Sequence, residues 1–217
     1  MKKILQTLMF LILFSLSSLA QTQVVTNNKL VIKHGDITLY LTDDTCTMVS
    51  KHTITYSKFK KLDSDRDDHW FQDTYKGKYS KEPYLHSGYD LGHLTPAHIT
   101  SYNDTLNHLS FSLFNQAPQI AAFNRGKWAQ LEGSVEDSIA KYKSDAIIIT
   151  GVIYDPTVKE YLTKSRIPIP TAYFKIVVIK KKTWCWIGSN NNGSILPTTV
   201  SELNKIFQIN KMTLTIK

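Results

Sequence analysis

The sequence lacks most of the features that would place it in a specialised class of protein. Only two cysteines, Cys46 and Cys185, occur among its 217 residues, so at most one disulfide can form and the cysteines alone do not make a zinc site. No segment is repeated, which excludes a repeat array. No apolar run reaches the roughly 20 residues that a membrane-spanning helix needs. A single globular domain is the simplest class that remains.

The first twenty residues are typical of a secretory signal rather than of folded protein. Two lysines precede a mostly apolar run over residues 4–16, and the small residues Ser18 and Ala20 stand where a signal peptidase would cut. A transmembrane anchor is the alternative, but the run is short and contains polar residues. Residue 21, directly after the cleavage point, is a glutamine and not a cysteine that could carry a lipid. We expect a signal peptide at 1–20 and a secreted or periplasmic domain at 21–217 that does not bind membranes.

The chain is basic. It has 26 Lys and Arg residues against 18 Asp and Glu residues, a net charge of +8, and removal of the signal would take away two of those positive charges. An excess of positive charge favours a polyanionic partner such as a nucleic acid. Many secreted proteins are basic for other reasons, so the charge alone does not identify the partner.

The two cysteines leave two states open. Export would place them in an oxidising compartment, and a bridge between Cys46 and Cys185 would close a long loop and stabilise the fold by about 2–4 kcal/mol. Cys185, which stands between Trp184 and Trp186, fits a buried apolar position equally well. The sequence favours neither state.

Hydrophobic patterning predicts more strands than helices. Residues 58–80 are highly charged and are expected to form a surface loop, and residues 81–100 contain glycines and a proline that indicate an irregular, turned path. Short alternating or continuous apolar runs predict the strands. They are expected at 30–32 and 37–41, at 53–56, at 107–114, at 146–152, and in a hairpin of 172–179 with 183–187.

Two helices are expected. The clearer one covers residues 125–142 and has Trp128, Leu131, Val135 and Ile139 on one apolar face. The other begins at the capping-box spacing of residues 199–202. Together the elements predict an α+β domain with a largely antiparallel central sheet and flanking helices.

A short part of the chain concentrates groups suited to phosphodiester hydrolysis. His93, Asn115, Asn124 and Glu132 lie within forty residues of one another. Imidazole can accept a proton from water near neutral pH, and amide and carboxylate oxygens suit a hard cation such as Mg²⁺. Asn124 precedes the predicted helix, where it could also be the N-cap. Glu132 would lie about 80° round a regular helix from Asn124, so the two oxygens could flank one cleft.

Several ordered segments resemble one family. Asp90-Leu91-Gly92-His93, followed by Leu-Thr-Pro-Ala, is similar to the signature Asp-Arg-Gly-His followed by Leu-Ala-Pro-Ala. That signature belongs to the DNA/RNA non-specific endonucleases, the ββα-metal nucleases, and the resemblance implies a ββα-metal active-site motif. The resemblance runs over about 53–210, the core of the expected domain. The other similar segments are 114–119, 123–132, 150–154 and 169–175.

The resemblance implies a Mg²⁺-dependent endonuclease that cuts DNA, RNA or both, with Mn²⁺ as an alternative ion. His93 would be the general base, and Asn124 the single direct protein ligand of a hydrated ion. Glu132 would hold the metal's waters, and Asn115 and Asp90 would support the base and the metal. The ion would stabilise charge on the phosphate and on the leaving 3′ oxygen, giving 5′-phosphate products.

One position departs from the family pattern. Leu91 stands where the signature has an arginine that faces the phosphate, and loss of one such donor can lower a rate by about 10²–10³. Arg66 resembles another phosphate-binding arginine, and Arg125 and Lys127 are expected to contact phosphates. A catalytically weakened nucleic-acid-binding protein therefore stays open as an alternative, as does a phosphodiesterase for small nucleotides. A homodimer is compatible with the sequence, which identifies no inhibitor.

Overall fold

The computed structural model describes most of the expected domain. It covers residues 22–26, 30–41, 47–63, 67–71, 80–157, 160–163, 165–209 and 212–216. The expected signal, Cys46 and Arg66 lie outside these residues, so the predictions made for them stay predictions. Among the described residues, no helix is long and apolar enough to cross a membrane.

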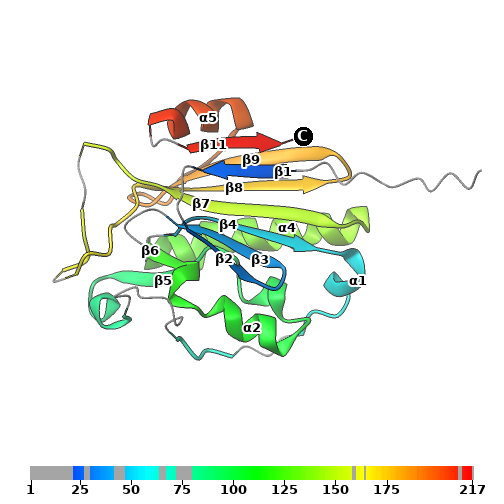
Figure 1. Cartoon of the computed structure of the whole chain (residues 1–217), viewed down its shortest axis with the longest axis horizontal. Helices are drawn as coiled ribbons and strands as arrows, with labels where there is room; N and C mark the ends of the chain where they lie inside the picture. The colour runs from blue at the N-terminus through cyan, green and yellow to red at the C-terminus, as the bar shows by residue number, and fades with distance from the viewer. Residues whose placement is uncertain are drawn as a thin grey trace, which may run out of the picture.

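A seven-stranded antiparallel sheet forms the centre of the fold (Figure 1). Its strands lie in the order β10-β9-β8-β7-β4-β3-β2. All eight residues of β7, the middle strand, are buried, as expected for a strand covered on both faces. The predicted sheet is confirmed. The strands are β2 (Leu30–His34), β3 (Ile37–Leu41), β4 (Thr47–Ile54), β7 (Ala146–Ile153), β8 (Ala172–Ile179), β9 (Lys182–Ser189) and β10 (Ile195–Thr198).

Helices cover both faces of this sheet. Successive residues of a strand face opposite sides, so Tyr173 and Phe174 of β8 contact the layers on opposite faces of the sheet. Tyr173 packs against Trp128, which precedes α4 (Ala129–Tyr142), with ring centroids 5.6 Å apart. Phe174 packs at 4.8 Å against Phe207 of α5 (Val200–Ile209). In Figure 1, α5 lies beside the two-stranded sheet of β1 (Thr22–Thr26) and β11 (Met212–Ile216).

A separate two-stranded ribbon carries the sequence motif. β5 (Tyr89–His93) pairs antiparallel with β6 (Gln116–Ile120), which continues through α3 (Ala121–Phe123) and the turn η4 (Asn124–Trp128) into α4. The chain thus forms a ββα unit. At Gly92 any Cβ would collide with the Gln119 side chain, so the close pairing requires glycine.

A single buried asparagine attaches this ribbon to the end of the main sheet. Asn190 follows β9 and is fully buried. Its Nδ2 donates to the carbonyl oxygens of Pro118 (3.0 Å) and Pro170 (2.8 Å), and its Oδ1 accepts from the backbone N–H of Ile120 at 2.9 Å. These bonds reach Pro118 and Ile120 of β6 and Pro170 in the loop before β8. They therefore fix the ribbon relative to the large sheet.

Two predicted strands are wrong in part or in whole. The strand expected at 107–114 is a helix, α2 (Asp104–Ser110), followed by a 3₁₀ turn, η3 (Leu113–Asn115). The Asn103 side chain caps α2 by accepting from the backbone N–H of Leu106 at 2.8 Å. The strand expected at 53–56 ends at Ile54, because Thr55 caps the short helix α1 (Tyr56–Phe59). The remaining 3₁₀ helices are η1 (Glu82–Tyr84) and η2 (His98–Thr100).

The helix and hairpin predictions are otherwise confirmed. The four residues predicted on the inner face of the long helix are all buried, although α4 begins at Ala129 rather than at 125. Thr199 and Glu202 form the capping box of α5: Glu202 N–H donates to Thr199 Oγ1 at 3.1 Å, and Thr199 N–H donates to Glu202 Oε2 at 2.9 Å. Cys185 has a free, buried thiol.

Candidate active site

Asp90 accepts hydrogen bonds from two other sequence-predicted site residues, Asn124 and Arg125, and the three form one group. Arg125 donates from Nε to Asp90 Oδ2 at 2.9 Å and from Nη2 to Oδ1 at 2.6 Å, and Asn124 Nδ2 donates to Oδ2 at 2.9 Å. Burial acts to raise the pKa of Asp90, but the hydrogen bonds from Arg125 and Asn124 and the charge of Arg125 lower it below its ordinary value. The carboxylate is therefore ionised at neutral pH and held in one orientation.

The contact with Asp90 determines which way the Asn124 amide points. A carboxylate oxygen can only accept a hydrogen bond, so the atom of Asn124 that faces it is Nδ2, and Oδ1 is left to bind a cation. The expectation that Asn124 caps the long helix is wrong, because α4 begins at Ala129. Gly126 between them has non-helical dihedral angles (φ −106°, ψ −111°), so the 80° relation expected between Asn124 and Glu132 does not hold.

Replacing Arg125 by glutamine should raise the pKa of Asp90 towards or above its usual 3.8. The reason is that the variant removes the bidentate partner and its positive charge while it keeps the bond from Asn124. A carboxyl with a lowered pKa stabilises the fold above its unfolded pKa and loses that contribution as the pH falls through the folded pKa. The variant should therefore be less stable than the unsubstituted protein above about pH 3.8, and this difference should disappear as the pH falls through the folded pKa of Asp90.

An NMR titration of the Asp90 carboxyl carbon would measure this shift. Lys127→Gln is the matched control. Lys127 is an exposed cation in the same turn, and its substitution removes the same charge. Equal Asp90 pKa values in Arg125→Gln and in the unsubstituted protein would contradict the expectation.

His93 lies at the end of β5 between two aromatic rings. Its ring centroid is 4.9 Å from that of Trp70 and 5.0 Å from that of Phe111, which it meets edge to face at 87°. The histidine is half-buried. Packing on two sides restricts the rotation of the imidazole, and its Nε2 atom is buried.

Asn115 holds the backbone that follows His93. Its side chain is fully buried. Oδ1 accepts from the Thr95 N–H at 3.0 Å, and Nδ2 donates to the carbonyl oxygens of Thr95 and Ser110, both at 2.8 Å. The Leu94 N–H donates to the Asn115 carbonyl at 2.9 Å. Because both amide N–H groups are used on backbone, Asn115 positions the segment that follows His93.

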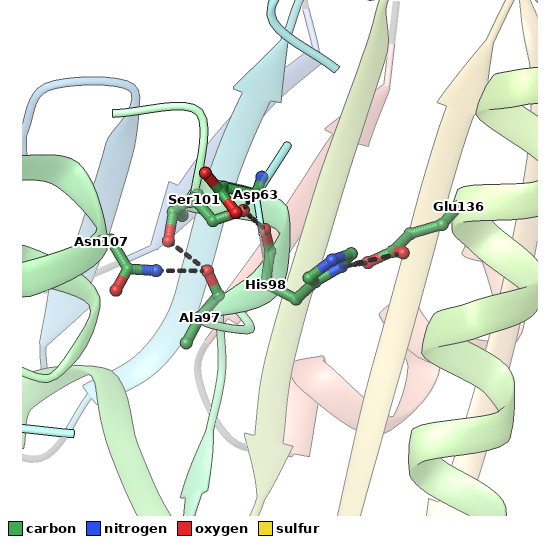
Figure 2. A network of polar contacts seen from close by, with 7 residues as sticks. Asp63, Ala97, His98, Ser101, Asn107 and Glu136 are labelled. Atoms are coloured by element: carbon green, nitrogen blue, oxygen red, sulfur yellow. Dashed lines mark hydrogen bonds and ion pairs between the residues drawn. The ribbon is translucent and has the colours of Figure 1, made fainter. Parts of the chain in front are cut away.

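A polar network ties the loop after β5 to two helices (Figure 2). His98 Nδ1 lies 2.9 and 3.0 Å from the two carboxylate oxygens of Glu136 in α4. The Ala97 carbonyl accepts from Asn107 Nδ2 of α2 at 2.8 Å, and the His98 carbonyl accepts from Ser101 Oγ at 2.8 Å. The network fixes the position of α4 relative to the ribbon, and hence of the groups that α4 carries.

Lys175 is a buried cation that the sequence analysis did not identify. It lies on β8 and is 1% exposed. Its Nζ donates to Thr150 Oγ1 at 2.8 Å, lies 3.4 Å from Glu132 Oε1, and stands 4.9 Å from the centre of the Trp128 ring. Lysine is almost never fully buried without a partner. A single lysine inside the apolar run 172–179 was the signal that could have revealed it.

Glu132 and Lys175 form a coupled pair in a poorly solvated place. Burial raises the pKa of Glu132, and the charge and hydrogen bond of Lys175 oppose that rise. Burial likewise lowers the pKa of Lys175, and Glu132 opposes that fall. The Glu132 side chain keeps 23% of its surface exposed, so it links the buried lysine with the solvent side of α4.

The remaining predicted residues differ in how the structure places them. Lys127 is exposed in η4, next to the group around Asp90. Leu91 packs against an apolar cluster, so it supplies no polar group. Arg66 lies outside the described residues. The structure thus brings Asp90, Asn124 and Arg125 together, with His93 further along the strand that carries Asp90.

The oxygen atoms at this site fit a hydrated divalent cation. Asn124 Oδ1 and the Asp90 carboxylate are hard donors, and the bond between the two side chains keeps them adjacent. Within the described ranges, no three His, Cys, Asp or Glu side chains form a metal-binding group. So small a set of protein oxygens suits Mg²⁺, which keeps several of its waters in most protein sites.

Comparison with known proteins gives a consistent result. Residues 17–214 match the model of the DNA/RNA non-specific endonuclease family. The chain is 32% identical over 130 residues to the mitochondrial nuclease of Saccharomyces cerevisiae (54% of this chain, 39% of that protein). It is 31% identical over 105 residues to nuclease C1 of Cunninghamella echinulata (44% and 41%). The matches span about two fifths of the length of these relatives.

A solved structure shares the fold. The crystal structure of the EndoG/EndoGI complex superposes with a TM-score of 0.71 at 22% identity, covering 86% of this chain and 84% of that one. Since the sequences are this distant, the likeness establishes the arrangement of strands and helices and nothing finer.

Proposed function

This chain belongs to the DNA/RNA non-specific endonuclease family, and we propose on that basis that it is a Mg²⁺-dependent endonuclease that hydrolyses phosphodiester bonds of DNA and RNA. The observation that carries the proposal is the Asp90–Asn124–Arg125 group, in which Asp90 belongs to the strand that ends in His93 and the other two residues belong to η4. A base, an oxygen site for a cation and an exposed guanidinium are the groups that this hydrolysis needs.

His93 is the proposed general base. It takes a proton from the water that attacks phosphorus, because an imidazole can accept a proton near neutral pH and packing holds this ring in a fixed direction. Trp70 and Phe111 hold the ring from two sides. Asn115 fixes the backbone immediately after the histidine.

Asn124 Oδ1 is the proposed protein ligand of the cation. When bound there, Mg²⁺ would stabilise negative charge on the phosphate and on the leaving 3′ oxygen. Asp90 keeps the Asn124 amide in its orientation, and Glu132 is proposed to accept hydrogen bonds from waters near this position.

Arg125 and Lys127 are the proposed phosphate contacts. The Arg125 side chain is 74% exposed although it binds Asp90, and its remaining N–H donors can reach a phosphate oxygen. Arg125 would thereby supply the donor that Leu91 does not. Contacts of this kind read the backbone rather than the bases, which fits cleavage without sequence preference. Arg66 is proposed as a further contact.

We also propose that the protein is secreted or periplasmic, after cleavage behind residue 20. Support comes from the basic start, the apolar run, and the small residues Ser18 and Ala20. The N-terminal sequence of the exported protein should begin at Gln21, and a chain that retains residues 1–20 inside the cell would contradict this.

Incubation of plasmid DNA and of RNA with the purified protein tests the proposed activity. We expect both to be cut with Mg²⁺ and neither with a chelator in excess. Asn124→Ala should require a much higher Mg²⁺ concentration, because it removes the proposed ligand, whereas Asn191→Ala, at an exposed loop asparagine, should not. The ends produced should be ligated without prior phosphorylation.

Two results would decide against the proposal. Cutting that continues in the chelator would exclude a metal-dependent reaction. Retention of nucleic acid without any cutting would instead support the weakened binding protein, which is the alternative that Leu91 favours.

A further inference from the structure

Three segments that are distant in sequence meet at one end of the central sheet. The strand register places Ile54 of β4, Ala146 of β7, Ile179 of β8 and Lys182 of β9 in one row across the sheet. Beyond this row lie α1, the C-terminal end of α4 and the β8–β9 turn, all at the right of Figure 1, whereas β5 and β6 lie at the left. The backbone N–H of Tyr56 donates to Asp145 Oδ1 at 2.8 Å, which joins α1 to the chain after α4.

Exposed lysines cover this end of the molecule, which we call the lysine end. Each of the three segments supplies at least two of them, and together they make seven exposed cations: Lys60, Lys61, Lys141, Lys143, Lys180, Lys181 and Lys182. The partial negative charge at the end of α4 would favour a cation or two there, but it does not account for this number. Asp145 nearby already accepts the bond from Tyr56.

Aromatic rings lie among these lysines. Tyr142 and Trp184 pack with ring centroids 5.7 Å apart, and the Lys182 Nζ stands 5.5 Å from the centre of the Tyr142 ring. The Lys60 Nζ stands 5.5 Å from the centre of the Tyr56 ring. Rings beneath long aliphatic stems hold the ammonium groups above the surface and limit their disorder.

The β8–β9 turn keeps two lysines at unfavourable backbone angles. Lys180 and Lys181 both have positive φ, 49° and 64°, where a two-residue hairpin turn favours glycine or asparagine. Two adjacent like charges add repulsion. Local stability therefore does not explain why lysines stand here, and a ligand for their charge would.

We propose that the lysine end is a second binding surface for the phosphate backbone of nucleic acid, separate from the candidate active site. The inference rests on the proposed function for the identity of the polyanion. α4 runs from the Asn124 turn to the lysine end and is about 21 Å long at 1.5 Å per residue, a length that equals about six base pairs of duplex. A substrate must exceed that length to contact both places, so the lysine end holds long strands while the active site cuts them.

Binding without cleavage tests the surface. The triple variant Lys141→Gln, Lys180→Gln, Lys181→Gln removes three charges from the lysine end. The matched control, Lys33→Gln, Lys81→Gln, Lys205→Gln, removes three exposed charges elsewhere. Fluorescence anisotropy with a labelled 40-base-pair duplex in EDTA gives affinity without turnover. We expect the first variant to bind at least tenfold more weakly and to lose about 2–3 units of the slope of log K against log salt concentration.

Cleavage then separates this surface from the active site. For the long duplex the first variant should show a higher KM and an unchanged kcat, and for a four-base-pair substrate it should match the unsubstituted protein. Equal losses of affinity in both triple variants would show that only net charge matters, and this would overturn the proposal. Unchanged binding in the variant at the lysine end would also overturn it. Absence of any cleavage, with selective loss of binding, would refute the proposed enzyme and still support the surface.

Discussion

Replacing His93 by alanine should lower the rate of phosphodiester cleavage by about 10²–10⁴, the usual contribution of a positioned general base. The effect should be on the chemical step, because the His93 ring packs between Trp70 and Phe111, whereas Asp90 orients Asn124, the proposed ligand of the cation. Single-turnover cleavage of a labelled duplex at saturating Mg²⁺ measures that step directly.

Four comparisons make the His93 result specific. Binding of duplex in EDTA should be unchanged in His93→Ala, and the Mg²⁺ concentration for half-maximal rate should shift little. Added imidazole should restore part of the rate, since the substitution leaves a ring-sized space between two aromatic side chains. His86→Asn, at an exposed histidine with positive φ, should cleave normally. A rate within tenfold of the unsubstituted protein would remove His93 from the mechanism.

Replacing Lys175 by methionine should cost about 3–5 kcal/mol of folding stability, the usual effect of removing one partner from a buried ion pair. Methionine fills a similar volume but leaves Glu132 without its cation, in a place where burial already raises the pKa of that carboxyl. Thr150 also loses its donor. Urea unfolding followed by fluorescence measures the loss.

The pH dependence identifies the cause. A carboxyl whose folded pKa is raised further stabilises the fold most below its unfolded pKa, and that contribution is lost as the pH rises through the folded pKa. The cost of Lys175→Met should therefore grow from about pH 4.5 upward. The double variant Lys175→Met, Glu132→Gln should recover most of the loss, and Lys33→Met, at an exposed lysine, should lose little. A small and pH-independent cost would show that the pair is not coupled.

The parts of the fold that follow from local pattern were predictable. The sequence predicts the buried face of α4, formed by Leu131, Val135 and Ile139, because the spacing of its apolar residues places them on one side of a helix. The apolar run of β7 likewise identifies the centre of the sheet. The strand expected at 107–114 is wrong because the Asn103 side chain caps α2, and the helix forms in spite of the alternating apolar residues.

The candidate site was predictable as a set of residues but not as a set of contacts. The segments that carry His93, Asn124 and Arg125 are evident from their resemblance to a family, yet the contacts of Arg125 with Asp90 join positions 35 residues apart. Lys175 was missed for the same reason, since its partner Glu132 is 43 residues away. The non-helical dihedral angles of Gly126 change the direction of the chain between Asn124 and α4. A periodic pattern of apolar residues does not reveal such a change.

The attachment of β6 through Asn190 makes the position of the catalytic strands depend on a residue outside the candidate active site. Since the Asn190 amide bridges the ribbon and the large sheet, the orientation of the catalytic strands depends on how this one residue packs. Substitutions of Asn190 could retune turnover without altering any group that meets substrate, so variation between homologues at this position is a route by which the rate could diverge while the chemistry stays the same.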